Sequence, residues 1–296
     1  MRGFRINAAG STVSRGDSEL TKSPRGKTPL SKLWSCLCHG RTLSQLLFTG
    51  LLVWIGIQMV SHPTSSANIE RYCPFGGMET LLPWLKGKGT WCSLSTINIA
   101  MLLGVLLITL VFKRAFCSHI CPVGTIAEWT AKLGRFVPFL PLRVPKRVDR
   151  ALKWLKYPVL VLILYLTYVA QDLIFRQVDP FYVLFTFGKG HEVAGFSMPL
   201  ILGIIAIGVA IPMVFCRYLC PFAACLTPFA RISPVQVHRD KSKCIDCGAC
   251  DKACDWAIDV SSVAKVTTGE CSLCQDCIRK CPVPGTLYLG VGGPIK

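Results

Sequence analysis

The chain has 296 residues, of which 51% are hydrophobic and 17% are charged, and its mean hydropathy is +0.46. This composition argues against a single water-soluble core, because the apolar residues are gathered into runs. The formal net charge of +17 would suit a nucleic-acid-binding protein. The basic residues flank the apolar runs, however, where membrane topology and anionic lipid account for them, so we expect no nucleic-acid partner.

Residues 1–41 contain eight Lys or Arg and almost no apolar periodicity. This composition predicts a disordered, basic tail. The segment has no twin-Arg pair and no early apolar region with a small-residue cleavage site, which favours a tail that is retained on the cytoplasmic side.

Four apolar runs are each close to the ~20 residues that a membrane-spanning helix needs. They lie at about residues 42–60, 94–112, 157–175 and 196–216. Ten Lys or Arg fall in 113–156, but two fall in 176–195. The positive-inside rule therefore predicts a multi-pass protein of a bacterial-type cytoplasmic membrane, with both termini in the cytoplasm. The alternative for any one run is a buried helix of a soluble core.

A weak internal repeat supports this layout. The sequences Phe116–Pro122 and Phe215–Pro221 share the pattern F-C-x3-C-P after the second and fourth spans. Before those spans, Cys73-Pro74-Phe75 is matched by Asp179-Pro180-Phe181. We therefore predict that residues 42–235 form a four-helix membrane domain of two parallel hairpins related by an axis along the membrane normal.

Eight cysteines in residues 236–296 follow the spacing C-x2-C-x2-C-x3-C twice, with Pro282 after the second run. This is the two-cluster bacterial ferredoxin pattern, in which the fourth cysteine of each run completes the other cluster. The spacing predicts one [4Fe–4S] cluster on Cys244, Cys247, Cys250 and Cys281, and a second on Cys271, Cys274, Cys277 and Cys254. Four-thiolate zinc is the alternative. The fold class is thus a mainly α membrane protein with a small α+β ferredoxin-like domain.

One position departs from the ferredoxin pattern. Cys254 is followed by Asp255 and Trp256, where the run usually has proline. We expect a different local turn there, with an altered solvent exposure and potential of that cluster.

The repeated membrane motif supplies four more thiols, which are Cys117, Cys121, Cys216 and Cys220. Proline after the second cysteine of each pair predicts that each span ends near that cysteine, at the inner membrane face. If the hairpins are related by a pseudo-twofold axis, the pairs can meet as a four-thiol site for a metal, a cluster or reversible disulfides. The alternative is that these cysteines are small apolar packing residues.

Other polar residues near the spans are weaker candidates. Asp172 lies near the outer end of the third span and is a candidate acceptor for a quinol proton; it could equally extend to the interface. Cys73 and Cys92 fall in the first outer loop, where they could form a disulfide, or the turn at Cys73 could shape a quinone or partner pocket. Glu79 is expected to be a solvated loop residue. The spans contain no histidine, which argues against a membrane haem.

The order of these motifs resembles the membrane ferredoxin-type quinol dehydrogenases of the NapH/NosR group. The resemblance covers about residues 42–285 and rests on the four spans, the two C-x3-C-P motifs and the terminal two-cluster module. It implies electron transfer between the quinone pool or a cytoplasmic donor and another redox subunit. NosR-type members also carry an extracytoplasmic flavin domain, so a separate flavin- or iron–sulfur-bearing partner is a candidate.

We therefore predict a membrane-bound iron–sulfur electron-transfer subunit of a quinol dehydrogenase or related oxidoreductase. It would have two [4Fe–4S] clusters, and its candidate partners are lipid, quinone and other redox subunits. One alternative is an assembly factor that reduces a metal or thiol during maturation of a respiratory enzyme. Another is a non-redox membrane scaffold with structural metal.

Overall fold

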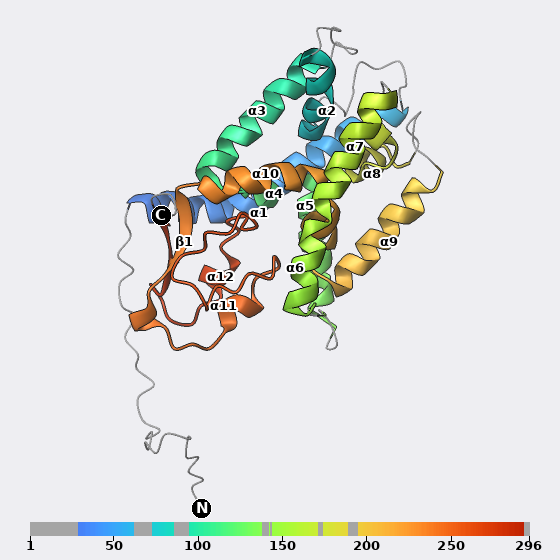
Figure 1. Cartoon of the computed structure of the whole chain (residues 1–296). Helices are drawn as coiled ribbons and strands as arrows, with labels where there is room; N and C mark the ends of the chain where they lie inside the picture. Colours follow the sequence, from blue (N-terminus) through green and yellow to red (C-terminus); the bar gives the residue numbers. More distant parts are fainter. Residues whose placement is uncertain are drawn as a thin grey trace, which may run out of the picture.

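The computed structural model describes residues 29–61, 73–85, 95–137, 142, 144–170, 174–188 and 195–292. Most of them are helical (Figure 1). The longer helices are α1 (Pro29–Ser61), α2 (Pro74–Leu85), α3 (Ser95–Phe112), α5 (Pro122–Gly134), α6 (Lys146–Trp154), α7 (Lys156–Ala170), α9 (Ser197–Ala210) and α10 (Pro221–Ile232). The short ones are α4 (Ala115–His119), η2 (Ile174–Gln177), α8 (Pro180–Phe185), η3 (Phe215–Leu219), η4 (Lys241–Lys243), α11 (Ala249–Lys252) and α12 (Asp276–Arg279).

The helices α1, α3, α7 and α9 coincide with the four predicted apolar runs. Arg41–Ser61 and Lys146–Val169 are long and apolar enough to cross a membrane, by length and composition, whereas Ile97–Phe112 and Ser197–Ala210 are shorter. Only 28% and 11% of the two longer windows is buried. Core helices of a soluble protein would be mostly buried, so these apolar surfaces need another apolar environment.

The predicted tail boundary at residue 41 lies too far along the chain. Helix α1 already begins at Pro29, and residues 1–28 lie outside the described part. Arg41 is 4% exposed and pairs with Glu128 of α5. This buried ion pair places Arg41, the predicted last residue of the tail, inside α1 and against α5.

The prediction that each span ends near its second cysteine is also wrong. Helix α3 ends at Phe112 and α9 at Ala210, before either cysteine pair. Lys113 and Met213 have positive φ values of 51° and 57°, which interrupt the helical path. The cysteines lie instead on α4, on the π-helix η3, and directly before the prolines that start α5 and α10.

The segments where we expected outer loops contain two helices, α2 and α8. Helix α2 packs along α3 (Figure 1). This approach is close because Gly77 has no side chain: a Cβ there would lie 2.3 Å from the carbonyl oxygen of Asn98. The glycine therefore brings the start of α2, and with it Cys73, against the apolar cluster that contains Leu102 and Phe116.

The C-terminal domain has a small antiparallel sheet of β1 (Val235–Arg239) and β2 (Leu287–Val291), in which Val237 is paired with Leu289. Its core contains Val237, Val260, Leu273 and Leu287 together with Cys250 and Cys277. The strands thus join the two ends of the domain and enclose the cysteine loops between them. The domain lies beside α1, α4 and the end of α3 (Figure 1).

Replacing Gly77 by alanine should lower the stability of the α2–α3 packing by about 1–3 kcal/mol, because the new methyl group meets backbone atoms that cannot move aside. Thermal unfolding in detergent measures this as a lower Tm. Gly104→Ala is the matched control, since a Cβ at Gly104 meets nothing within 4 Å and alanine favours helix. An equal loss in both variants would contradict the close packing.

Candidate metal centre

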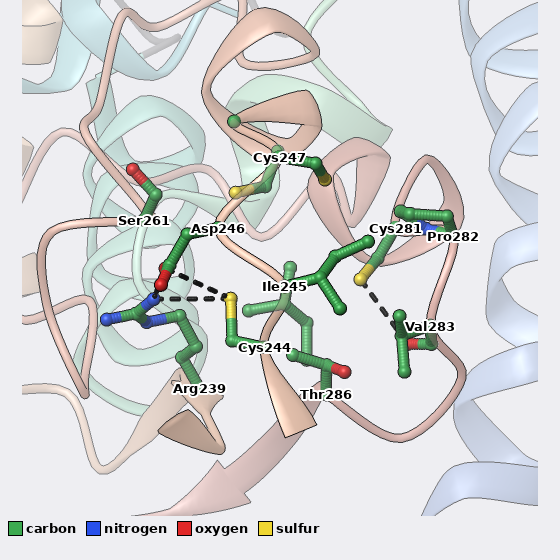
Figure 2. Close-up of a pocket in the computed structure, with 13 residues that line it drawn as sticks. Arg239, Cys244, Ile245, Asp246, Cys247, Ser261, Cys281, Pro282, Val283 and Thr286 are labelled. Carbon is green, nitrogen blue, oxygen red and sulfur yellow. Dashed lines mark hydrogen bonds and ion pairs between the residues drawn. The ribbon is translucent and has the colours of Figure 1, made fainter. Parts of the chain in front are cut away.

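Four of the ferredoxin-type cysteines line one pocket near the protein surface. They are Cys244, Cys247, Cys250 and Cys281, which are the residues predicted to hold the first cluster (Figure 2). Arg239 donates a hydrogen bond from Nη1 to Sγ of Cys244 at 3.3 Å and is also paired with Asp246. The Cys244 sulfur thus has a positively charged hydrogen-bond donor beside it. Cys247 is exposed, so this cysteine group is the more solvent-accessible of the two.

The other four cysteines also gather in one place. The charge of Cys254 acts on both Cys274 and Cys277, and the charge of Cys271 acts on Cys254 in turn. Burial raises the pKa of the Cys254 thiol to about 12. This thiol therefore needs the charge of a metal to become a thiolate.

The two cysteine loops share one backbone conformation, which explains how both can hold the same kind of group. Asp246 and Leu273 have φ values of 49° and 51°, and Gly248 and Gln275 have values of 66° and 62°. Each left-handed residue follows a cysteine by two or precedes one by two, and each loop leads into a one-turn helix, α11 or α12. These left-handed residues bend the chain between successive cysteines in both loops.

The four thiols of the C-x3-C-P motifs are brought together as well. Cys121 interacts electrostatically with Cys117 and Cys220, and Cys216 does so with the other three. Arg114 lies beside them. Burial alone would lower the pKa of Arg114, but the negative charges of Cys117, Glu270, Cys220 and Cys216 raise it. We name these four cysteines the membrane thiol group.

Arg114 and Trp256 join the membrane thiol group to the ferredoxin domain. The guanidinium of Arg114 lies 4.6 Å from the ring centroid of Trp256 and donates to the carbonyl oxygen of Cys216 at 3.5 Å. Trp256 is 2% exposed and packs against Cys216 and Met213, with Cys254 at its edge. Trp256, which follows the Asp255 that stands in the usual proline position, is therefore a contact between the second cysteine group and the thiols of the membrane domain.

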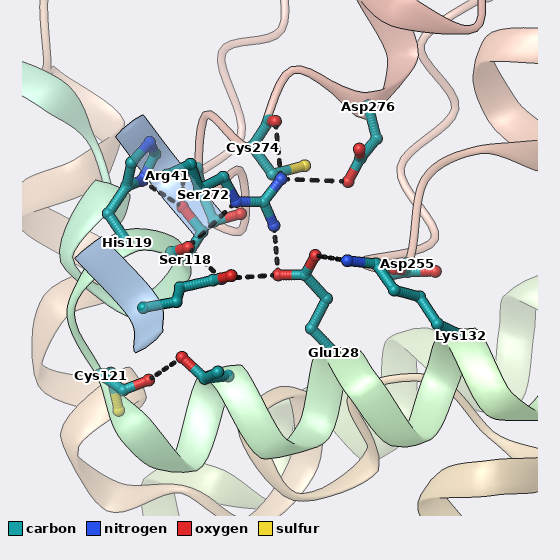
Figure 3. Close-up of polar contacts among 12 residues, drawn as sticks. Arg41, Ser118, His119, Cys121, Glu128, Lys132, Asp255, Ser272, Cys274 and Asp276 are labelled. Carbon is teal, nitrogen blue, oxygen red and sulfur yellow. Dashed lines mark hydrogen bonds and ion pairs between the residues drawn. The ribbon is translucent and has the colours of Figure 1, made fainter. Parts of the chain in front are cut away.

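Arg41 makes a second junction, from α1. Its Nε donates to the carbonyl oxygen of Ser118 at 3.1 Å, and its Nη1 donates to that of Cys274 at 3.0 Å (Figure 3). The same guanidinium pairs with Glu128 and, at 3.5 Å, with Asp276. One side chain thus fixes α4, α5 and the second cysteine loop relative to one another.

Glu270 completes the interface between the domains. It pairs with Arg114 at 2.8 Å and with Lys156, and both cations are fully buried. Burial alone would raise the pKa of Glu270, but these two cations lower it. The basic residues that flank the apolar runs were expected to be explained by anionic lipid and membrane topology. Lys113, Arg114 and Lys156 are instead buried at this interface.

The remaining sequence candidates have different outcomes. Asp172 and Cys92 lie outside the described residues, so the proton and disulfide hypotheses stay predictions. Glu79 was expected to be solvated and is instead 3% exposed, accepting a hydrogen bond from Thr167 at 3.0 Å. The expectation failed because the segment was read as a loop. It forms α2 instead, and Glu79 lies on the face of α2 toward α7.

In the described part of the chain, no three His, Cys, Asp or Glu side chains converge where one metal ion could bind.

Sequence similarity to known proteins shows that the chain belongs to the family of 4Fe–4S binding domain proteins. The sequence profile of that domain matches twice, at residues 94–139 and 194–238, and each match contains one C-x3-C-P motif. YccM of Escherichia coli (strain K12), named as a candidate electron transport protein, is 29% identical over 91% of this chain and 80% of its own length. An uncharacterised protein of Methanocaldococcus jannaschii is 32% identical over 62% of this chain and 75% of its own.

The ferredoxin-type protein NapH of Escherichia coli (strain K12) is 26% identical over 81% of this chain and 85% of its own length. The predicted resemblance to the NapH group is thereby confirmed. No solved structure matches the chain.

Glu270→Gln should weaken the docking of the ferredoxin domain by about 3–5 kcal/mol, because it leaves Arg114 and Lys156 buried without a counter-charge. Hydrogen exchange of the C-terminal domain in detergent-solubilised protein measures this as faster exchange at the interface. Since the pKa of Glu270 is lowered, its contribution is complete above the unfolded-state pKa and is lost as the pH falls through the folded-state pKa.

Asp259→Asn is the control for this experiment. Asp259 pairs with Lys146 at 2.8 Å across the same interface, but both side chains are exposed. Its loss should cost less than about 1 kcal/mol. Similar exchange rates in the two variants would show that Glu270 does not secure the interface.

Proposed function

We propose that the protein is a membrane-bound iron–sulfur electron carrier, in which electrons pass between the ferredoxin domain and a redox centre on the membrane thiol group. The observation that carries this proposal is a short hydrogen-bonded path. The backbone N–H of Arg114 donates to the carbonyl oxygen of Cys271 at 3.4 Å, and the N–H of Cys117 donates to the carbonyl oxygen of Arg114 at 3.0 Å. One residue therefore connects a ligand of each centre.

The order of the centres follows from their burial. The first cysteine group includes the exposed Cys247 and would exchange electrons with a soluble partner. The second group contacts Arg41, Arg114 and Trp256 and faces the membrane domain. The clusters that these groups would hold supply one-electron transfer, and the protein fixes their spacing and surroundings. A flavin- or iron–sulfur-bearing subunit is a fitting external partner.

The membrane arrangement that we propose is four spans in two parallel hairpins. Its support is the large apolar side chains exposed on all four apolar helices. They include Leu47 and Trp54 on α1, Leu103 and Leu107 on α3, Val161 and Leu162 on α7, and Leu200 and Leu202 on α9. The repeated match of one domain profile supports the two halves. Both termini would be cytoplasmic by the positive-inside rule.

Quinone is the membrane substrate that fits best. A shallow groove lies between α5, α8 and α9, and its lining is apolar apart from Thr130. Val123, Pro180 and Phe215 line it, and each is within two residues of a thiol of the membrane thiol group or of Asp179. An apolar groove open to lipid beside a redox centre suits a quinone ring with an isoprenoid tail.

Cys117→Ser should abolish reduction of the ferredoxin clusters by a quinol, because electrons must enter through the membrane thiol group. Anaerobic addition of a short-chain quinol to full-length protein in detergent, followed by bleaching of the cluster absorbance, measures the rate. Cys225→Ser on α10 is the control, since Cys225 belongs to none of the three cysteine groups. Bleaching of Cys117→Ser at the normal rate would remove the proposed route.

Trp256→Leu should slow the same bleaching more than Trp256→Phe, because only the second variant keeps an aromatic ring between Cys254 and Cys216. Leucine removes the stacking with Arg114 and phenylalanine weakens it, so the Tm of each variant is measured as well. Trp256→Ala should cost about 3–5 kcal/mol of stability through the cavity it leaves. Equal rates for leucine and phenylalanine at equal Tm would show that the ring is packing alone.

A further inference from the structure

Four helices of the membrane domain begin in the same way, with an acceptor side chain followed by proline. Helices α5 and α10 follow Cys121 and Cys220, whose backbone angles are φ −63°, ψ 118° and φ −64°, ψ 113°. Asp179 before α8 has φ −64°, ψ 117°. Asp179 therefore occupies the backbone position that a cysteine occupies elsewhere. The fourth case is Cys73, which precedes Pro74 at the start of α2.

Cys73 and Asp179 lie close together in the folded chain. Sγ of Cys73 lies 3.6 Å from Oδ2 of Asp179, although 106 residues separate them. The charge of Asp179 also acts on Cys220. Cys73 packs against the same apolar cluster as Cys117, Cys121 and Cys220. The Cys73–Asp179 pair thus lies at the edge of the membrane thiol group, and the pair and the group form one site.

Each of these side chains also receives backbone hydrogen bonds that fix its orientation. Asp179 Oδ1 accepts from the N–H of Phe181 at 3.0 Å, and Sγ of Cys220 accepts from that of Ala223 at 3.4 Å. The sulfur of Cys73 accepts from the N–H groups of Phe75 and Gly76. Charge-assisted bonds of this kind hold a ligand atom in one orientation before a metal arrives.

We propose that Cys73 and Asp179 are ligands of an iron centre that also uses the membrane thiol group, with the Cys73 thiolate and the Asp179 carboxylate binding iron on the side facing α2 and α8. On loading, the S–H bond of Cys73 breaks as the S–Fe bond forms, and the proton is released to solvent. This inference rests on the proposed function, because it assumes a cluster at the membrane thiol group. Carboxylate oxygen and thiolate sulfur are both ligands that iron accepts.

The test uses full-length protein in detergent, loaded anaerobically with iron and sulfide. Wild-type protein should hold more than the about eight iron atoms of two [4Fe–4S] clusters, and a third reducible EPR signal should accompany them. Cys73→Ser and Asp179→Asn should change the g-values of that third signal and leave the ferredoxin signals unchanged. Asn keeps the side-chain oxygen that accepts from Phe181, so its fold is preserved. Asp179→Cys should retain the third centre with a further altered signal.

Cys117→Ser separates this inference from the function beneath it. If Cys117→Ser removes the third signal while Cys73→Ser and Asp179→Asn leave its g-values and the iron content at wild-type values, the ligand assignment is overturned and the electron-carrier proposal stands. If wild-type protein binds about eight iron atoms and shows no third signal, both fail. Cys225→Ser is the control variant, and its iron content and EPR signals should match those of wild-type protein. A lowered Tm with unchanged g-values would mark Cys73 and Asp179 as structural residues and so count against the proposal.

Discussion

The buried guanidinium of Arg114 is the contact on which the relation between the two domains depends. Arg114 is 0% exposed and binds Glu270, the face of Trp256 and the carbonyl oxygen of Cys216 at once. An unpaired charge at this depth would cost several kcal/mol, so the folded state must supply all of these partners together. The ferredoxin domain therefore docks in one position, and the cysteine groups on either side of Arg114 keep a fixed separation.

A fixed separation matters because the groups that these cysteines would hold carry negative charge. Thiolate-ligated clusters are anionic, and burying them requires cations nearby. Lys113, Arg114 and Arg217 are buried within a few residues of the membrane thiol group. Asp149 and Glu270 neutralise only part of that charge, through Arg217 and Arg114 respectively. This surplus of positive charge would balance the negative charge of the proposed centre.

The sequence predicted the features that have a short, repeated signature. The apolar runs located α1, α3, α7 and α9, and the cysteine spacing predicted which residues would gather around Cys244 and around Cys271. It did not predict the breaks at Lys113 and Met213, because positive φ in these residues depends on tertiary contacts. The start of α8 did have a local signal, since Asp179 followed by Pro180 is a good N-cap and first helical residue. The partners of Arg114, which are Cys216, Trp256 and Glu270, come from three separate segments, and no spacing rule connects them.

The two halves of the membrane domain share a pattern and differ where function would require it. The π-helix η3 carries Cys216, whereas the matching Cys117 lies on the α-helix α4. A π-helical turn widens the backbone and turns its side chains, and such turns are frequent at functional sites. Here it sets Cys216 against Trp256, whereas the half that contains α4 meets the ferredoxin domain through Arg114 and Ser118. The two halves differ again on the side of α2 and α8, where Asp179 lies opposite Cys73 in place of a second cysteine. The proposed centre, although built on a repeated pattern, would therefore have two unlike sides, one facing the ferredoxin domain and one facing α2 and α8.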